Sequence, residues 1–183
     1  MSFSPKGSSG RKRQEGPFDL EGKPEKKELS PEKQEQRARN VLLHQLARSS
    51  KSTQQLRLIL EKREIESSIA EEVLTRFTEV GLIDDREFAR TLVSSRRKIA
   101  GKSASVIRRE LSQKGISIEL ADEVLADITQ EDESALASSL ALRRIAQLQR
   151  FEPEVRRRRL MGYLLRKGFS SSVVIVITSY PCW

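Results

Sequence analysis

A hydrophobic pattern that recurs about every fifty residues constrains the fold of this chain more than any other feature. Its apolar residues fall in three sets with similar internal gaps, at shifts of 51 and then 53 residues: Leu56, Leu60 and Ile65; Ile107, Leu111 and Ile116; Leu160, Leu164 and Phe169. The gap of four that opens each set is typical of one face of an amphipathic helix. Repeats of this length indicate supersecondary units stacked in a row.

Helix-start patterns divide the first copy into three helices. The starts are predicted by Ser30 before Pro31, by Ser52 with Gln55 at capping-box spacing, and by Ser67 or Ser68. We therefore expect an all-α fold of three tandem three-helix repeats in an elongated, curved body. The predicted boundaries are residues 30–82, 83–131 and 132–183.

The end of the third copy departs from the pattern. A run of β-branched residues, Val173-Val174-Ile175-Val176-Ile177-Thr178, stands where a helix is required. Each of these residues is intrinsically less favourable in a helix than the best helix formers. Because a single strand would have no partner in a helical protein, we still expect a short buried helix from about Ser172.

The stretch from Gly81 to Arg90 predicts the end of one helix and the start of the next. Gly81 is suited to the left-handed conformation that closes a helix. Asp84 stands three residues before Glu87, the spacing at which a capping carboxylate accepts a backbone N–H while the second acid reaches back. Ile83 and Phe88 have the separation of a hydrophobic staple.

This stretch also resembles the turn motif of the RecX family, and the resemblance covers roughly residues 37–169. The matching residues are Gly81, Leu82, Ile83, Asp84, Asp85, Phe88, Ala89 and Arg90. The resemblance implies an architectural role for these eight. It also implies a regulator that lodges in the groove of the RecA filament on single-stranded DNA. Such a regulator suppresses filament growth, ATP hydrolysis and strand exchange, and so modulates recombination and DNA repair.

The termini and the cysteine content limit the class of protein. Residues 1–29 are rich in Ser, Gly, Pro, Lys and Glu, and we expect a disordered, solubilising tail because they offer little apolar surface to bury. The single cysteine, Cys182, excludes a disulfide framework. No secretory signal or membrane-spanning run is recognisable, so a cytoplasmic location is expected.

The sequence offers little for catalysis. His44 is the only histidine and has no second metal ligand or nucleophile near it in sequence. Asp84 and Asp85 are adjacent at a predicted helix start, where side chains do not face one another and capping explains both. We find no glycine-rich phosphate loop. The prediction is a protein without enzymatic activity, cofactor or metal.

Positive charge is concentrated toward the C-terminal end. The formal net charge is +8, and the residues from Glu133 onward hold nine Lys and Arg against three acids. The candidate contact residues of the second unit are Arg96, Arg97, Lys98, Lys102, Arg108 and Arg109. Those of the third are Arg143, Arg144, Arg150, Arg156, Arg157, Arg158, Arg159, Arg166 and Lys167. A solvated face explains the second-unit group as well as binding does, whereas the unbalanced charge of the third favours binding.

The expected partner is a long polyanionic target bound by a monomer. A row of units offers an extended face, which suits the RecA filament with its single-stranded DNA phosphates. None of the few aromatic residues interleaves with the arginine run, so base-stacking contacts are not expected. The rival interpretation is a low-specificity nucleic-acid-binding protein that acts directly on DNA. A helical scaffold for an unrelated partner is a third.

Overall fold

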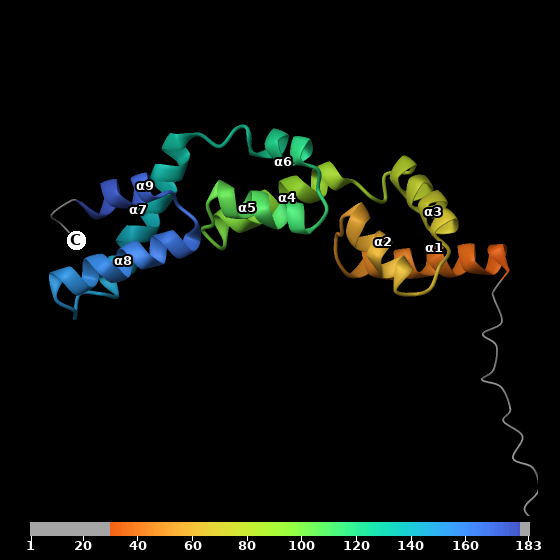
Figure 1. Cartoon of the computed structure of the whole chain (residues 1–183), viewed down its shortest axis with the longest axis horizontal. Coiled ribbons are helices and arrows are strands. Elements are labelled where there is room, and N and C mark those ends of the chain that lie inside the picture. Colours follow the sequence, from red (N-terminus) through yellow and green to blue (C-terminus); the bar gives the residue numbers. More distant parts are fainter. Residues whose placement is uncertain (1–29, 180–183) are drawn as a thin grey trace, which may run out of the picture.

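The computed structural model describes residues 30–179, and every regular element within that range is an α-helix (Figure 1). The helices are α1 (Pro31–Arg48), α2 (Thr53–Glu61), α3 (Ser67–Glu79), α4 (Asp85–Lys98), α5 (Ala104–Gln113), α6 (Ile118–Leu125), α7 (Gln130–Ala146), α8 (Pro153–Lys167) and α9 (Ser171–Thr178). The predicted disordered tail at 1–29 and the residues 180–183, with Cys182, lie outside the described range.

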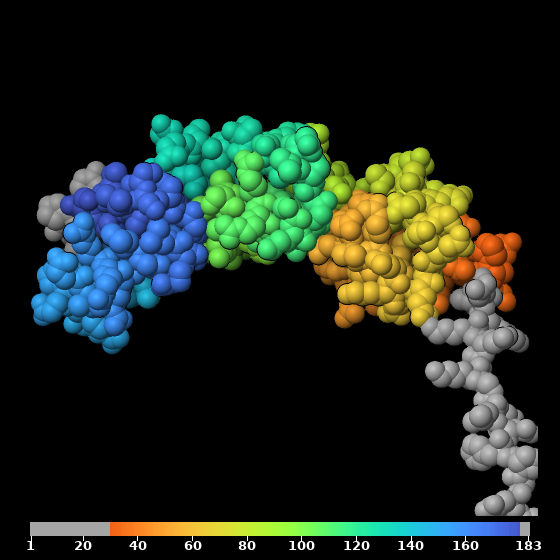
Figure 2. Space-filling view, viewed as in Figure 1, coloured from red at the N-terminus to blue at the C-terminus, as the bar shows by residue number. Residues whose placement is uncertain are grey.

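Each set of three helices has its own hydrophobic core. The first core includes Leu42 and Leu56, the second Ile107 and Leu111, and the third Leu160 with its neighbours. The closest helix–helix packing occurs within a set and not between sets. Figures 1 and 2 show the three units side by side in sequence order along an arc. The predicted elongated, curved all-α body is confirmed.

The helix starts follow the sequence patterns with two differences. Ser52 forms the complete capping box with Gln55, and α8 begins at Pro153 as the proline predicts. Ser30 precedes α1, but its side chain makes no capping hydrogen bond, so proline geometry alone marks that start. α3 begins at Ser67, and Glu66 occupies the N-cap position without a side-chain capping hydrogen bond.

The Gly81 to Arg90 stretch ends α3 and starts α4 as predicted, but two of the contacts predicted within it are not formed. Gly81 has a φ of 73°, and Asp84 accepts a hydrogen bond from the Glu87 backbone N–H at 2.9 Å. The carboxylate of Glu87 accepts from the Thr91 hydroxyl in place of the predicted reciprocal bond. Ile83 is buried in the first core and Phe88 in the second, so the predicted staple was wrong. Ile83 faces back because the chain is still closing the first unit there.

The last helix confirms the prediction for the β-branched run. Ser170 caps α9 by accepting from the Val173 backbone N–H, and Val173, Val174 and Ile177 are buried in the third core. Burial of these side chains outweighs an intrinsic preference of a few tenths of a kcal/mol per residue. Tertiary packing therefore decides the conformation of this segment.

The first joint, between units one and two, is made by the N-terminal turn of α2. The Ser52 hydroxyl donates to the Lys114 carbonyl oxygen at 2.5 Å, and the Thr53 N–H donates to Asp85 Oδ1 at 2.8 Å. Lys114 ends α5, and Asp85 opens α4. Ser52 is fully buried by these contacts. A middle helix thus docks by its N-terminus on the next unit.

The second joint, between units two and three, repeats this geometry one unit further on. The Ser103 N–H donates to the Lys167 carbonyl oxygen at 3.1 Å, and the Ala104 N–H donates to Glu133 Oε1 at 3.2 Å. The Ser105 hydroxyl donates to the Gly168 carbonyl oxygen at 3.0 Å. Because both joints use equivalent positions, each unit is placed on the next in the same way. The curvature of the arc follows from that repetition.

Glycine is required at each joint for close approach as well as for backbone conformation. Gly115 and Gly168 have φ values of 78° and 91°. A Cβ on Gly115 would overlap Cβ and Cγ of Gln54, and one on Gly168 would lie 2.6 Å from Ser103 Oγ. Glu64 occupies the equivalent position after α2 with a φ of 58°, where no middle helix of a preceding unit exists within the described range. All three units therefore keep the left-handed conformation at this position, and glycine stands there only in the two units on which another unit docks.

Candidate partner-binding surface

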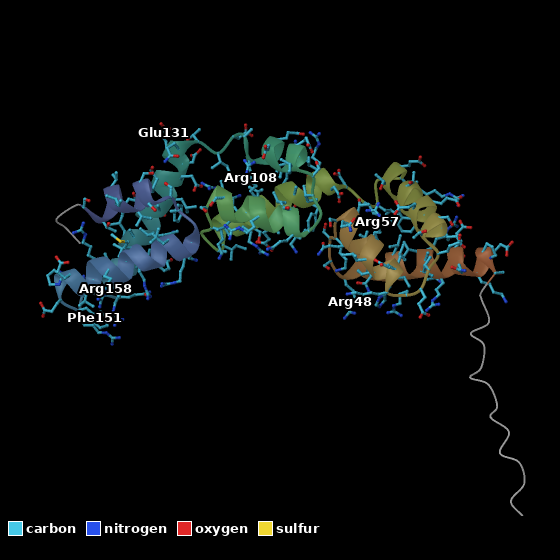
Figure 3. The ribbon with its side chains drawn as sticks, in the orientation of Figure 1. Arg48, Arg57, Arg108, Glu131, Phe151 and Arg158 are labelled. Atoms are coloured by element: carbon cyan, nitrogen blue, oxygen red, sulfur yellow. The ribbon has the colours of Figure 1, made fainter. Side chains whose placement is uncertain are left out.

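The second-unit arginines are largely occupied by carboxylates of their own fold. Arg96 forms a bidentate pair with Glu110, with Nε–Oε2 and Nη2–Oε1 distances of 2.8 and 2.5 Å. These hydrogen bonds are the main reason that the pKa of Glu110 is lowered. Arg108 pairs with Asp122 in the same position that Arg57 and its partner hold in the first unit (Figure 3). Two of the six second-unit candidates thus stabilise the repeat.

Arg97 belongs to the second joint and not to an open surface. Its guanidinium pairs with Glu133, and both side chains are largely buried, at 17% and 16% exposure. Glu133 also accepts from the Ala104 backbone, so one carboxylate ties α4, α5 and α7 together. Replacing Arg97 would disturb the unit-to-unit contact before it changed any partner contact.

The three other second-unit candidates lie at separate places. Lys98, at the end of α4, lines a shallow hollow with Arg90 and Ile99. Arg109 is exposed on α5, and Lys102 is half-buried in the turn before that helix. The positive charge of Lys102 contributes to lowering the pKa of Glu110. The structure does not gather the second-unit group into one patch.

The third unit carries arginines of a different kind. Within residues 30–179, none of its nine basic side chains forms an ion pair with a carboxylate. The ion pairs of the described residues lie in the first two units and at the second joint. Its own exposed acids lie at two helix starts: Glu131 and Asp132 in the first turn of α7, and Glu152 and Glu154 on either side of Pro153 at the start of α8. The third unit therefore presents guanidinium groups that the fold itself does not neutralise.

Two of these basic residues are nevertheless held by neighbours in the fold, and a third is half-buried. Arg144 and Lys167 lie over the Tyr163 ring at 5.4 and 5.6 Å from its centroid, which favours a structural role for both. Lys167 Nζ also donates to the Ala100 carbonyl oxygen across the second joint. Arg156 is half-buried, and its Nε has no hydrogen-bond partner among the described atoms.

An aromatic ring lies among the arginines, contrary to the expectation from sequence. The Phe151 ring contacts two guanidinium groups, with the central carbons of Arg159 and Arg150 at 4.0 and 4.9 Å from the ring centroid. Arg159 and Phe151 are eight residues apart, and the turn between α7 and α8 brings them together. A linear reading of the arginine run could not find this contact.

The exposed members define the candidate surface, which we name the α8 arginine surface. Its residues are Arg143 at the end of α7, Arg150 in the following turn, and Arg157, Arg158, Arg159 and Arg166 on α8. Figure 3 shows the labelled Arg158 and Phe151 at the outer end of α8, at the opposite end of the arc from α1. Arginine forks match the geometry of carboxylate and phosphate groups.

Other candidate chemistry finds little support in the described part of the chain. His44 is exposed on α1 beside a shallow hollow lined by Arg37 and Arg63. No group of three or more His, Cys, Asp or Glu side chains within residues 30–179 is placed to hold a metal ion. None of the helices there combines the length and apolar character needed to cross a bilayer.

The turn-motif residues divide between core, cap and joint. Ile83, Phe88 and Ala89 are buried, Gly81 and Asp84 shape the turn, and Asp85 bonds to the preceding unit. Leu82 and Arg90 are exposed on the same turn and helix. Sequence reasoning assigned Asp85 to helix capping and missed its role in the joint. The available signal was the 48-residue shift that relates Asp85 to Glu133.

Comparison with protein families matches each unit separately. The models described as the first, second and third three-helix domains of RecX match residues 38–77, 84–125 and 131–175. Among curated proteins, "Regulatory protein RecX" of Streptomyces coelicolor is 37% identical over 140 residues, which cover 76% of this chain and 74% of that protein. The protein of the same name from Thermobifida fusca is 37% identical over 79% of this chain and 78% of its own length.

Comparison with solved structures finds the same architecture. A crystal structure of RecX from Lactobacillus salivarius superposes with a TM-score of 0.70, covering 80% of this chain and 95% of that one, at 21% identity. A second structure, of "regulatory protein RecX", has a TM-score of 0.70 at 27% identity and covers 80% of this chain and 74% of that one. The first of these likenesses concerns the fold alone.

Proposed function

Because the chain belongs to the RecX family, we propose that it regulates RecA by binding the filament that RecA forms on single-stranded DNA. In this proposal it inhibits filament growth, ATP hydrolysis and strand exchange without catalysing a reaction itself. The observation that carries the proposal is an elongated arc of rigidly repeated units with unpaired arginines at one end. Such a body suits a long, regular polymer better than a small ligand.

The two joints support this function because they fix the spacing of the units. A filament presents identical subunits at regular intervals, so a protein whose contact points are held at a constant separation binds it with higher affinity. Hydrogen bonds from Ser52 and Thr53 in one joint, and from Ser103 and Ala104 in the other, limit the freedom between units. Preorganisation of this kind reduces the entropy lost on binding.

The rival function, direct low-specificity binding to nucleic acid, rests on the same arginines. It predicts that the protein acts on DNA whether or not RecA is present. A filament regulator instead inhibits RecA at amounts well below one copy per RecA, under salt conditions where its hold on bare DNA is weak. Titration of the protein into a RecA ATPase reaction on single-stranded DNA separates the two.

A charge-reversal variant tests the assigned surface. We chose Arg143→Glu, Arg157→Glu, Arg158→Glu and Arg159→Glu because these side chains are exposed, whereas Arg144 lies over the Tyr163 ring and Arg156 is half-buried. We expect inhibition of the RecA ATPase to be lost while the helical circular-dichroism spectrum is unchanged. The matched control reverses four exposed cations of the first unit, Arg37, Arg48, Lys62 and Arg63. Full inhibition by the first variant, or equal loss in both, would contradict the assignment.

A further inference from the structure

The glycine in the middle of α8 has no evident purpose inside the fold. Gly162 is the tenth residue of a fifteen-residue helix, where glycine is less favourable than alanine. Its φ is not in the left-handed region. The only atom that an added Cβ would meet within 4 Å is Nη1 of Arg166, the far end of a flexible side chain. No packed neighbour therefore excludes a side chain at this position.

The residues one turn away on the same face are mostly arginines. Arg158 and Arg159 lie four and three positions before Gly162, and Leu165 and Arg166 lie three and four positions after it. All four are exposed. The Arg166 guanidinium lies back over the glycine, with Nη1 3.2 Å from the position that a Cβ would take. The absence of a side chain at Gly162 thus lets Arg166 lie along the helix, toward the two arginines of the preceding turn.

This arrangement is unfavourable without an anion. Arg158, Arg159 and Arg166 stand on neighbouring turns of one helix, where their like charges repel one another, and none has a carboxylate partner among residues 30–179. Glu154, four residues before Arg158, is the nearest acid on this side of the helix, and it forms no ion pair within the described residues either. A bound polyanion would relieve the repulsion and would pass close to the helix at the glycine.

The chemistry of the face favours a nucleic-acid backbone over an acidic protein surface. Protein interfaces have a core of apolar and aromatic side chains, whereas Leu165 is the only large apolar residue among the four that surround Gly162. Arginine forks bind phosphate oxygens, and the Phe151 ring holds the Arg159 and Arg150 guanidinium groups at the end of the row. A positively charged surface that follows the backbone is how proteins bind single strands without sequence preference.

We propose that Arg158, Arg159 and Arg166, arranged around Gly162 on α8, form a direct contact site for the phosphodiester backbone of single-stranded DNA. The site deepens the proposed function, because it assigns the DNA contact within the RecA–DNA filament to the third unit. Binding to DNA is measured without RecA, so a variant that binds DNA normally would contradict the contact site but not the regulation of RecA. Conversely, a protein that fails to inhibit RecA would contradict the regulation but not the contact site.

The experiment measures binding of a fluorescently labelled oligothymidine to the full chain by anisotropy at several salt concentrations. Each neutralised phosphate adds about 0.7 to the slope of log affinity against log salt for a single strand, so three contacts weaken binding about 20-fold from about 50 to 200 mM salt. In the variant Arg158→Ala, Arg159→Ala, Arg166→Ala the slope should fall by about 2. The control Arg37→Ala, Arg48→Ala, Arg63→Ala removes the same charge from the first unit and should leave the slope unchanged.

A second variant separates this site from a general loss of charge or stability. Gly162→Ala keeps every charge and should raise the melting temperature by about 1–4 °C. It should also displace Arg166 and lower the salt slope by about 0.7, the value for one phosphate. In an Arg166→Ala background the same glycine change should lower the slope no further. Equal slopes for wild type and Gly162→Ala, or equal losses in the two triple variants, would overturn the proposal.

Discussion

Gly115→Ala tests whether close docking between units, and not backbone conformation alone, requires glycine at the joint. Gly81→Ala is the matched control, because Gly81 has a similar φ of 73° but nothing lies within 4 Å of the position of its missing Cβ. Placing alanine in the left-handed conformation costs about 1–2 kcal/mol, and both variants bear this cost. Any additional loss in Gly115→Ala belongs to the joint.

The additional loss follows from which atoms an alanine would meet at position 115. They are Cβ and Cγ of Gln54, and Cβ cannot move unless α2 moves, since the Gln54 Cα is itself only 3.7 Å away. Overpacking at a site that cannot yield costs about 1–3 kcal/mol. We therefore expect Gly115→Ala to lower the free energy of unfolding by about 2–5 kcal/mol, against about 1–2 kcal/mol for Gly81→Ala.

In Gly115→Ala the first and second units could also relieve the overlap with Gln54 by separating at the joint. The assay therefore combines urea unfolding followed by circular dichroism with small-angle X-ray scattering of the native protein. We expect either the greater loss of stability or an increase in the radius of gyration for Gly115→Ala. Two variants with equal unfolding free energies and identical scattering curves would refute the reasoning that the joint needs a glycine for close approach.

Two further predictions concern single side chains. Asp84→Ala should lower the unfolding free energy by about 1 kcal/mol through the lost cap of α4, whereas Asp84→Asn should retain most of it; equal losses would contradict a capping role. Glu110 has a lowered pKa in the folded protein because Arg96 donates to it, so it contributes stability above the ordinary carboxyl pKa and loses it as the pH falls through the folded value. Glu110→Gln should therefore destabilise the protein at neutral pH and converge with wild type only as the pH falls below the lowered pKa of folded Glu110; a pH-independent difference would argue against the pair.

The buried face of each helix could be predicted from the sequence, because it depends only on the spacing of apolar residues along that helix. Leu56, Leu60 and their counterparts mark the buried face of each middle helix whatever their neighbours are. Capping pairs such as Ser52 with Gln55 act within one turn, so they too were visible. These signals determined the helix order, the threefold repeat, and the excess of positive charge in the third unit.

Which arginines are available to a partner was decided only by the tertiary structure. Arg96, Arg97 and Arg108 read in sequence like Arg158, but their carboxylate partners stand fourteen to thirty-six residues away, on other helices. The contact of Phe151 with Arg159 likewise depends on the course of the turn that precedes α8.

The sequence by itself therefore determined what each helix buries, since that depends on spacing along one helix. The tertiary structure alone decided how the units join and which charges stay unpaired. Asp85 and Glu133 show the reason, because each accepts a hydrogen bond from the backbone of the preceding unit. Every residue except proline has the same backbone N–H donor, so the identities of Thr53 and Ala104 do not indicate that these two N–H groups bond to the next unit.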